Sequence, residues 1–142
     1  MVLHREGNIL DSGADIICHQ VNCQGKMNSG VAKAIREKYP KVYNEYRRLY
    51  EEEVDLLGHI QPVLIDENHI IINMFAQYNY GYDGRRYTSY DAFWNCLGEI
   101  KKYITPGKTI AFPSKIGCVR GGANWTIIQT MIVTALANDY TI

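Results

Sequence analysis

The chain has 142 residues, and 15 Lys and Arg balance 15 Asp and Glu, so its formal net charge is zero. This length suits one domain over residues 1–142 and leaves no room for two cores of ordinary size. The missing basic excess disfavours general binding of nucleic acid. No apolar export segment or membrane span is visible, so we expect a cytoplasmic protein with no membrane partner.

The four cysteines are Cys18, Cys23, Cys96 and Cys118. Nothing else in the chain indicates secretion, so we expect reduced thiols rather than disulfides. No C-x-x-C pair is present, and neighbouring residues near Cys18 would lie on opposite strand faces. We therefore expect no metal and no cofactor.

The first predicted strand covers residues 14–20, a mostly apolar run typical of a strand that is buried on both faces. A polar loop over residues 21–30 follows, and apolar residues recur at helical spacing from Val31. Pro40 suits the first turn of a second helix. These features predict a strand, a glycine-containing loop and two helices.

Residues 60–65 and 70–75 predict two strands joined by a short polar turn. A loop rich in Tyr and Gly follows over residues 77–87. It could cover a phosphate or stack on a base, or it could be an exposed loop. Thr88 and Asp91 have the spacing of a capping box for the next helix.

Residues 109–113 predict a short strand, and the glycine-containing loop over residues 114–124 leads to a helix capped by Asn124. Tyr140 and Thr141 predict a last strand. Alternating strands and helices indicate a layered α/β domain with a largely parallel or mixed sheet. Both glycine-containing loops should line one crevice, where free N–H groups at helix starts suit phosphate oxygens.

Familiar phosphate-binding motifs do not match these loops. Gly25 and Gly30 have the spacing of a P-loop, but Val31 and Ala32 stand where Lys and Ser or Thr are required. Cys118 lacks the arginine six positions on that a cysteine phosphatase needs. Tight turns and close packing remain the structural alternative for the glycines.

Four segments occur in a familiar order, namely residues 7–10, 14–20, 22–32 and 113–125. Together they resemble the macro domain family, whose members bind ADP-ribose on a three-layer α/β/α fold with a central mixed, largely parallel sheet. Residues 19–25 and 38–41, with Tyr46, most resemble one branch of that family. The branch contains the yeast ADP-ribose-1″-phosphate phosphatase, the human terminal ADP-ribose glutamate hydrolase and the macro domains of DNA de-ADP-ribosylating antitoxins.

The resemblance implies that the ligand is ADP-ribose or a related small nucleotide, with an ADP-ribosylated macromolecule as a further partner. Asn8 stands where the family usually has an Asp that holds the adenine amino group. The resemblance implies ligand contacts by Asn8, Ile9, Gln20, Asn22, Gln24, Gly25, Met27, Ser29, Gly30, Val31, Gln77, Ser114, Ile116, Gly117, Cys118, Val119, Arg120, Gly121 and Gly122.

The resemblance also implies His19 and Asn22 as candidate catalytic residues. An imidazole can protonate a leaving ribose oxygen near neutral pH, and a hydrogen-bonded structural histidine is the alternative. Gln77 and Gly121 stand at the positions where the hydrolase relatives have a Lys and an acidic residue. We therefore do not expect Lys-dependent hydrolysis. Three hypotheses stay open: removal of the 1″-phosphate, binding without turnover, and de-ADP-ribosylation through Asn22 and an ordered water.

Overall fold

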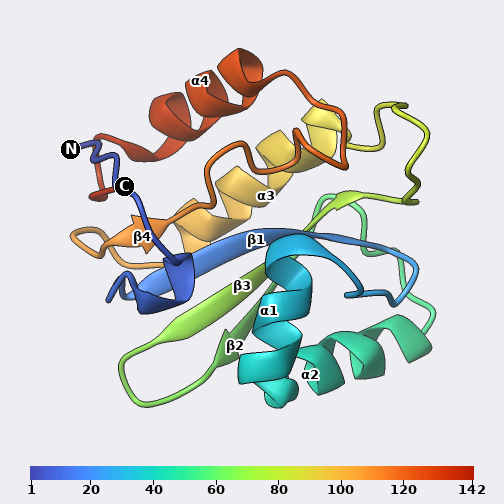
Figure 1. Ribbon diagram of the computed structural model, residues 1–142. Coiled ribbons are helices and arrows are strands. Elements are labelled where there is room, and N and C mark those ends of the chain that lie inside the picture. Colours follow the sequence, from blue (N-terminus) through green and yellow to red (C-terminus); the bar gives the residue numbers. More distant parts are fainter.

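The computed structural model describes residues 1–142 as a four-stranded sheet between two layers of helices (Figure 1). Its strands are ordered β2-β3-β1-β4, and β1 pairs in parallel with both neighbours, whereas β2 and β3 form an antiparallel hairpin. This confirms the expected three-layer α/β fold with a mixed, largely parallel sheet. The elements in chain order are η1 (Ile9–Asp11), β1 (Ile16–Asn22), α1 (Gly30–Lys38), α2 (Pro40–Glu51), β2 (Ile60–Leu64), β3 (Ile70–Gln77), α3 (Tyr90–Tyr103), β4 (Ile110–Ala111) and α4 (Trp125–Leu136).

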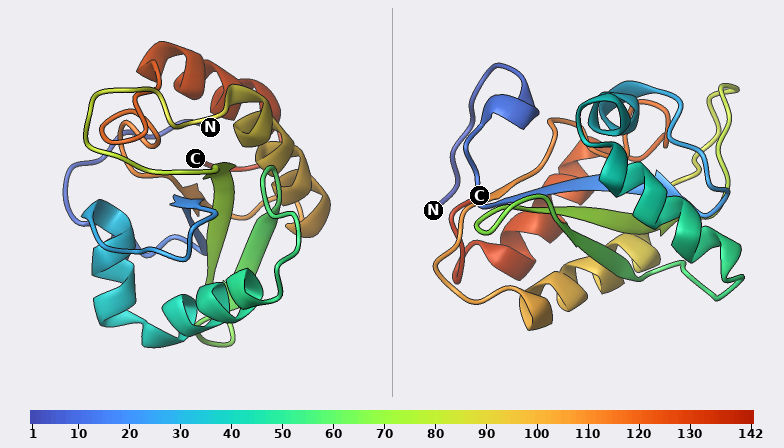
Figure 2. Two further views of the ribbon diagram at one scale, coloured as in Figure 1. Left: turned by 90° about the vertical axis from the view of Figure 1, so that its right-hand side faces the viewer. Right: turned by 90° about the horizontal axis from the view of Figure 1, so that it is seen from below.

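Alternate residues of the central strands supply the two halves of the core. Ile16 and Cys18 of β1 pack in a cluster with apolar residues of α3 and α4. Ile17 and Val21 belong to a second cluster with Ile35 of α1 and residues of α2. Figure 2 shows the two helical layers on opposite faces of the sheet.

Several predicted boundaries differ from the structure. The first strand begins later than expected and ends at Asn22, because its ladder with β3 continues to the pair Asn22 and Gln77. The capping box at Thr88 is wrong, since Ser89 caps α3 by accepting a hydrogen bond from the Ala92 N–H. The strand expected over residues 109–113 covers only Ile110–Ala111.

The last part of the chain agrees with the prediction at the start of its helix and differs at its final strand. Asn124 caps α4 as expected, with its side-chain oxygen accepting from the Ile127 N–H. The final strand is reduced to a single bridge between Thr109 and Thr141.

All four cysteines are free thiols. No helix has the length and apolar character that crossing a lipid bilayer would require.

Candidate functional site

A cavity of about 420 Å³ lies at the carboxyl ends of β1 and β3. Three loops enclose it: the first glycine loop (residues 23–29), the tyrosine loop (residues 78–87) and the second glycine loop (residues 112–124). The first glycine loop and the tyrosine loop lie on the right of Figure 1. The parallel pairing of β1 with both β3 and β4 brings the ends of these strands to one edge of the sheet.

Most residues that the family resemblance implied line this cavity. The structure brings together His19, Gln20, Asn22, Ser29, Gly30, Val31, Gln77, Ser114, Ile116, Gly117, Val119, Arg120 and Gly121. They come from the end of β1, the start of α1, the end of β3 and the second glycine loop.

Two residues of the first glycine loop face the protein interior instead. Met27 is fully buried and belongs to the core on the α1 and α2 face. Gly25 has a φ of 74° and lies so close to the side chains of Arg47 and Tyr50 that a Cβ atom would clash with both. The apolar side chain of Met27 and the absence of a side chain at Gly25 therefore allow the loop to pack against the α2 side of the protein.

Five further residues implied by the resemblance are not part of the cavity wall. The side chain of Asn8 caps η1, and the Sγ of Cys118 donates to the Ile116 carbonyl of its own loop. Gln24 donates to the carbonyl of Tyr78. The other two, Ile9 and Gly122, pack respectively against the α1 and α2 core and against the backbone of residues 85–86.

Of the three cations of the cavity, only Arg120 was among the ligand contacts that the resemblance implied. Lys26, Lys115 and Arg120 line the cavity, and no Asp or Glu does. A chain with zero net charge thus forms a cavity with an excess of positive charge, which favours an anionic ligand. The other lining residues not foreseen as ligand contacts are Val21, Asn28, Ala32 and Pro113, whereas Tyr80, Gly81 and Tyr82 belong to the loop that was expected either to cover a phosphate or to be exposed.

The first turn of α1 leaves its amides open to the cavity. Ser29 occupies the N-cap position, but its side chain makes no capping hydrogen bond. The N–H groups of Gly30, Val31 and Ala32 have no acceptor in the protein, and all three residues line the cavity. Free amides at a helix start carry partial positive charge and suit phosphate oxygens.

The second glycine loop offers a further set of free amides. The N–H groups of Gly117, Val119 and Arg120 have no acceptor in the protein. Lys115 has a φ of 58° and Gly117 a φ of 74°, which turn the backbone tightly around the cavity. Successive amides in such a turn form a concavity that binds anions.

A polar network fastens the second glycine loop to the sheet. The Gln20 amide donates to Oε1 of Gln77 and to the hydroxyl of Thr88, each at 2.8 Å. The hydroxyl of Thr88 in turn donates to the Gly117 carbonyl at 2.8 Å. Gly121 must be glycine, because a Cβ atom would clash with the Thr88 hydroxyl and the Gly117 carbonyl. An acidic side chain at this position is therefore sterically excluded.

Asn22 serves the conformation of the first glycine loop. Its side chain donates to the Lys26 carbonyl at 2.9 Å and accepts from the Gln24 N–H at 3.0 Å. The Tyr46 hydroxyl, which is fully buried on α2, also contacts Asn22 and accepts from the Lys26 N–H. The amide of Asn22 is thus a positioning group for the loop.

His19 lies in the cavity wall with an exposed fraction of only 1%. Its Nε2 lies 2.5 Å from Oδ1 of Asn73 on β3, and its Nδ1 has no partner. Burial lowers the pKa of His19 to about 4 and outweighs the opposing effect of the Asn73 contact. The imidazole is therefore neutral at pH 7 and has no extra proton to give to a leaving group.

A side-chain contact joins the tyrosine loop to the second glycine loop at the cavity, in addition to the backbone hydrogen bond from the Tyr87 N–H to the Gly121 carbonyl. The Arg120 guanidinium lies over the Tyr82 ring, 4.2 Å from its centroid, and both residues line the cavity. This is a cation–π arrangement. It holds the positive charge of Arg120 at the rim of the cavity.

No protein-family model matches the chain, and no curated protein matches its sequence. Solved structures do match. The macrodomain of Mycobacterium tuberculosis DarG is 22% identical with a TM-score of 0.79, and the alignment covers 100% of this chain and 96% of that one. The macrodomain of Thermus aquaticus DarG is 21% identical with a TM-score of 0.81, and the alignment covers 99% and 95%.

A third match was solved with a nucleotide. Thermosipho africanus DarTG in complex with ADP-ribose is 18% identical with a TM-score of 0.75. The alignment covers 96% of this chain and 39% of that longer one. These likenesses show that the fold is that of a macrodomain.

Proposed function

We propose that this chain, which has the macrodomain fold, binds ADP-ribose or a macromolecule-linked ADP-ribosyl group in the cavity between its two glycine loops. The observation that carries the proposal is the charge of that cavity. It contains three cationic side chains, no carboxylate and two sets of free backbone amides. A diphosphate is the part of ADP-ribose that such a cavity fits best.

The two sets of amides suit a ligand with two linked phosphates. The start of α1 and the second glycine loop face the same cavity from different elements. Each could therefore bind one phosphate, with Lys26, Lys115 and Arg120 near the rest of the charge. The volume of about 420 Å³ lies within the range typical of small-molecule sites, roughly 300–1,000 Å³.

The cavity favours binding without turnover over phosphatase or hydrolase activity. His19 is neutral, Gln77 carries no charge and no Asp or Glu lines the cavity. General acid catalysis near neutral pH needs a group with a proton to give, and none of these residues supplies one. Asn22, the candidate for a water-assisted hydrolysis, is held by hydrogen bonds to the loop that follows it and to the Tyr46 hydroxyl of α2.

Titration calorimetry with ADP-ribose tests the proposal, with AMP and ribose as matched fragments. We expect binding of ADP-ribose and much weaker binding of AMP, which lacks the second phosphate. Absence of heat with ADP-ribose at roughly 0.1 mM protein, where a Kd of the same order would still be detected, would contradict the proposal.

Turnover is measured separately on the same protein. ADP-ribose-1″-phosphate and an ADP-ribosylated peptide are incubated with the chain, and free phosphate or free ADP-ribose is followed. We expect both substrates to bind and neither to be consumed. Release of phosphate or of ADP-ribose above the buffer rate would show that the cavity is catalytic.

A further inference from the structure

A row of polar side chains crosses the sheet from the cavity wall toward α2; His19 and Asn73 are buried and Gln61 is half-buried. Asn73 of β3 stands opposite His19 of β1 in the parallel ladder and opposite Gln61 of β2 in the antiparallel ladder. Asn73 is fully buried among the apolar residues that face α1 and α2. Such groups are costly to bury unless they are hydrogen-bonded, so their partners are informative.

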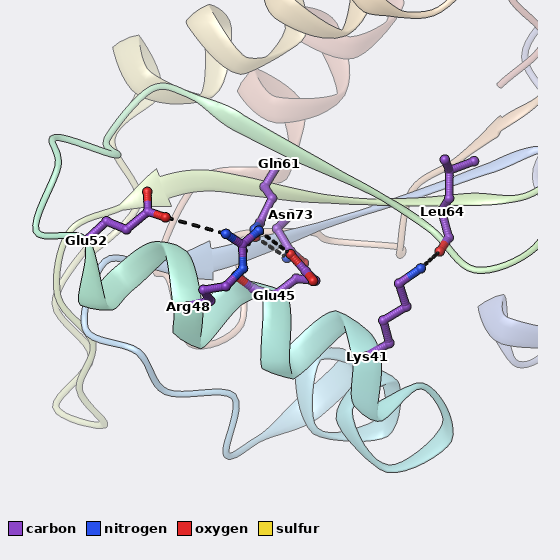
Figure 3. Close-up of polar contacts among 7 residues, drawn as sticks. All are labelled: Lys41, Glu45, Arg48, Glu52, Gln61, Leu64 and Asn73. Carbon is purple, nitrogen blue, oxygen red and sulfur yellow. Dashed lines mark hydrogen bonds and ion pairs between the residues drawn. The ribbon is translucent and has the colours of Figure 1, made fainter.

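The row ends on a backbone carbonyl of α2. Nε2 of Gln61 donates to the Glu45 carbonyl at 2.9 Å, and Nδ2 of Asn73 donates to Oε1 of Gln61 at 3.0 Å. Figure 3 shows this outer half of the row, with the Glu45 side chain held separately by Arg48. The chain of contacts continues from Oδ1 of Asn73 to Nε2 of His19 at 2.5 Å.

The end point sets the direction of every bond. A carbonyl can only accept, so Gln61 must present its NH₂ group to Glu45 and its oxygen to Asn73. Asn73 must then present its NH₂ group to Gln61 and its oxygen to His19. Nε2 of His19 is therefore the protonated nitrogen, and Nδ1 carries a lone pair with no partner in the protein.

We infer that His19 is a fixed hydrogen-bond acceptor of the cavity: the relay through Asn73, Gln61 and the Glu45 carbonyl keeps Nε2 protonated, and Nδ1 accepts a hydrogen bond from a sugar hydroxyl of the bound nucleotide. The tautomer follows from the relay alone, whereas the ligand contact rests on the proposed function. His19 lines the cavity, and its Nδ1 is a buried polar atom that the protein leaves unsatisfied. Nδ1 has almost no exposed surface, so a hydroxyl in the cavity reaches it only if the cavity wall shifts slightly on binding. A ligand hydroxyl that donates to it would remove the cost of that unpaired atom, and a group without a hydrogen to donate would not.

Long-range ¹H–¹⁵N spectra of the imidazole nitrogens test the relay directly in the full chain. The signal of His19 is identified as the one that disappears in His19→Gln. At pH 7 we expect a neutral ring with a protonated Nε2 and an unprotonated Nδ1. A ring with Nδ1 protonated, or with both nitrogens protonated, would overturn the inference.

Two matched variants separate the relay from general loosening of the α2 and β2 contact. Gln61→Met breaks the relay with little change in side-chain length, so we expect a mixture of the two neutral tautomers. Lys41→Met removes the other hydrogen bond between α2 and β2, from Lys41 to the Leu64 carbonyl, which is also drawn in Figure 3. It should leave the tautomer unchanged. An unchanged spectrum in Gln61→Met overturns the relay.

ADP-ribose is then added to the labelled wild-type protein, with binding followed in parallel by calorimetry. A shift of the Nδ1 resonance on binding supports the hydroxyl contact. Binding without any change at Nδ1 overturns that contact and leaves the proposed function standing. If ADP-ribose does not bind at all, the proposed function and the ligand contact both fail, and the spectrum of the free protein still decides the relay.

Discussion

The hydroxyl of Tyr46 lies 2.8 Å from the side-chain oxygen of Asn22, so that a buried residue of α2 holds the loop that follows β1. The same hydroxyl accepts from the Lys26 N–H at 3.0 Å. Burial raises the pKa of Tyr46 well above its ordinary value, so this hydroxyl keeps its proton and remains a donor. The first glycine loop thus receives its shape from the core.

Tyr46→Phe should loosen the first glycine loop while the ring still packs against Phe75. The variant leaves the Lys26 N–H without this acceptor and weakens the bonding of Asn22, so we expect a loss of about 1–2 kcal/mol in the free energy of unfolding. ADP-ribose should also bind more weakly. Urea unfolding and calorimetry measure the two effects.

Tyr43→Phe on the same helix is the matched control, because no hydrogen bond involves the Tyr43 hydroxyl. It should behave like wild type in both measurements. Equal stability of the two variants would show that the Tyr46 hydroxyl does not support the loop.

Gly121→Ala should damage the second glycine loop. The added Cβ atom would press on the Thr88 hydroxyl and the Gly117 carbonyl, and overpacking of this kind costs about 1–3 kcal/mol. We expect a lower melting temperature and a fall of about tenfold or more in affinity for ADP-ribose, since about 1.4 kcal/mol equals one factor of ten.

Gly98→Ala is the control, and its expected effect on stability has the opposite sign. Gly98 lies within α3, and nothing surrounds the site of its missing Cβ atom. Alanine is the better helix former by about 0.5–1 kcal/mol, so this variant should be slightly more stable than wild type and bind equally well. Equal loss of affinity in both variants would remove the role assigned to Gly121.

Arg120→Gln should weaken binding of ADP-ribose about fivefold, because an exposed cation at a cavity rim contributes about 1 kcal/mol to holding a phosphate. The effect should shrink as salt rises, since screening already weakens this contact. Calorimetry at two salt concentrations measures both quantities.

Lys102→Gln removes the same charge from the exposed surface of α3, outside the cavity. It should leave the affinity and its salt dependence unchanged. If Arg120→Gln and Lys102→Gln lose the same affinity relative to wild type, the net charge of the chain and not the position of Arg120 governs binding.

The free energy of unfolding should fall as pH is lowered from about 7 to 4.5. The pKa of His19 is lowered from 6.5 to about 4 in the folded chain, so between these values the unfolded chain binds the additional proton. The contribution of His19 is present above pH 6.5 and is lost as pH falls through about 4. One pKa unit corresponds to about 1.4 kcal/mol, which gives a loss of about 2–3 kcal/mol by pH 4.5.

His19→Gln removes this titration and should flatten the dependence of stability on pH relative to wild type. Urea unfolding across the interval provides the comparison, because the carboxyl groups that also titrate are common to both proteins. Parallel curves for the two proteins would mean that His19 is not buried in a neutral state.

Much of the fold was predictable because its signals are local. The hairpin of β2 and β3 follows from two apolar runs around a polar turn, and the cap at Asn124 needs only a neighbouring amide. The cap of α3 was placed one residue early, because Thr88 and Ser89 are both good caps. Only the bond from Thr88 to Gly117, far along the chain, decides between them.

The sequence by itself determined where the two glycine loops lie, because a strand that ends in a polar segment before a helix is a local pattern. Only the tertiary structure decided the chemistry of the residues in those loops and at the end of the strand before them. Met27 is core, Asn22 supports a loop and His19 is neutral, each through contacts with residues distant in sequence. Likewise, the chain has zero net charge, yet its cavity is lined by cations and by no carboxylate. Composition gives only the number of charges, whereas the fold determines where each charge lies.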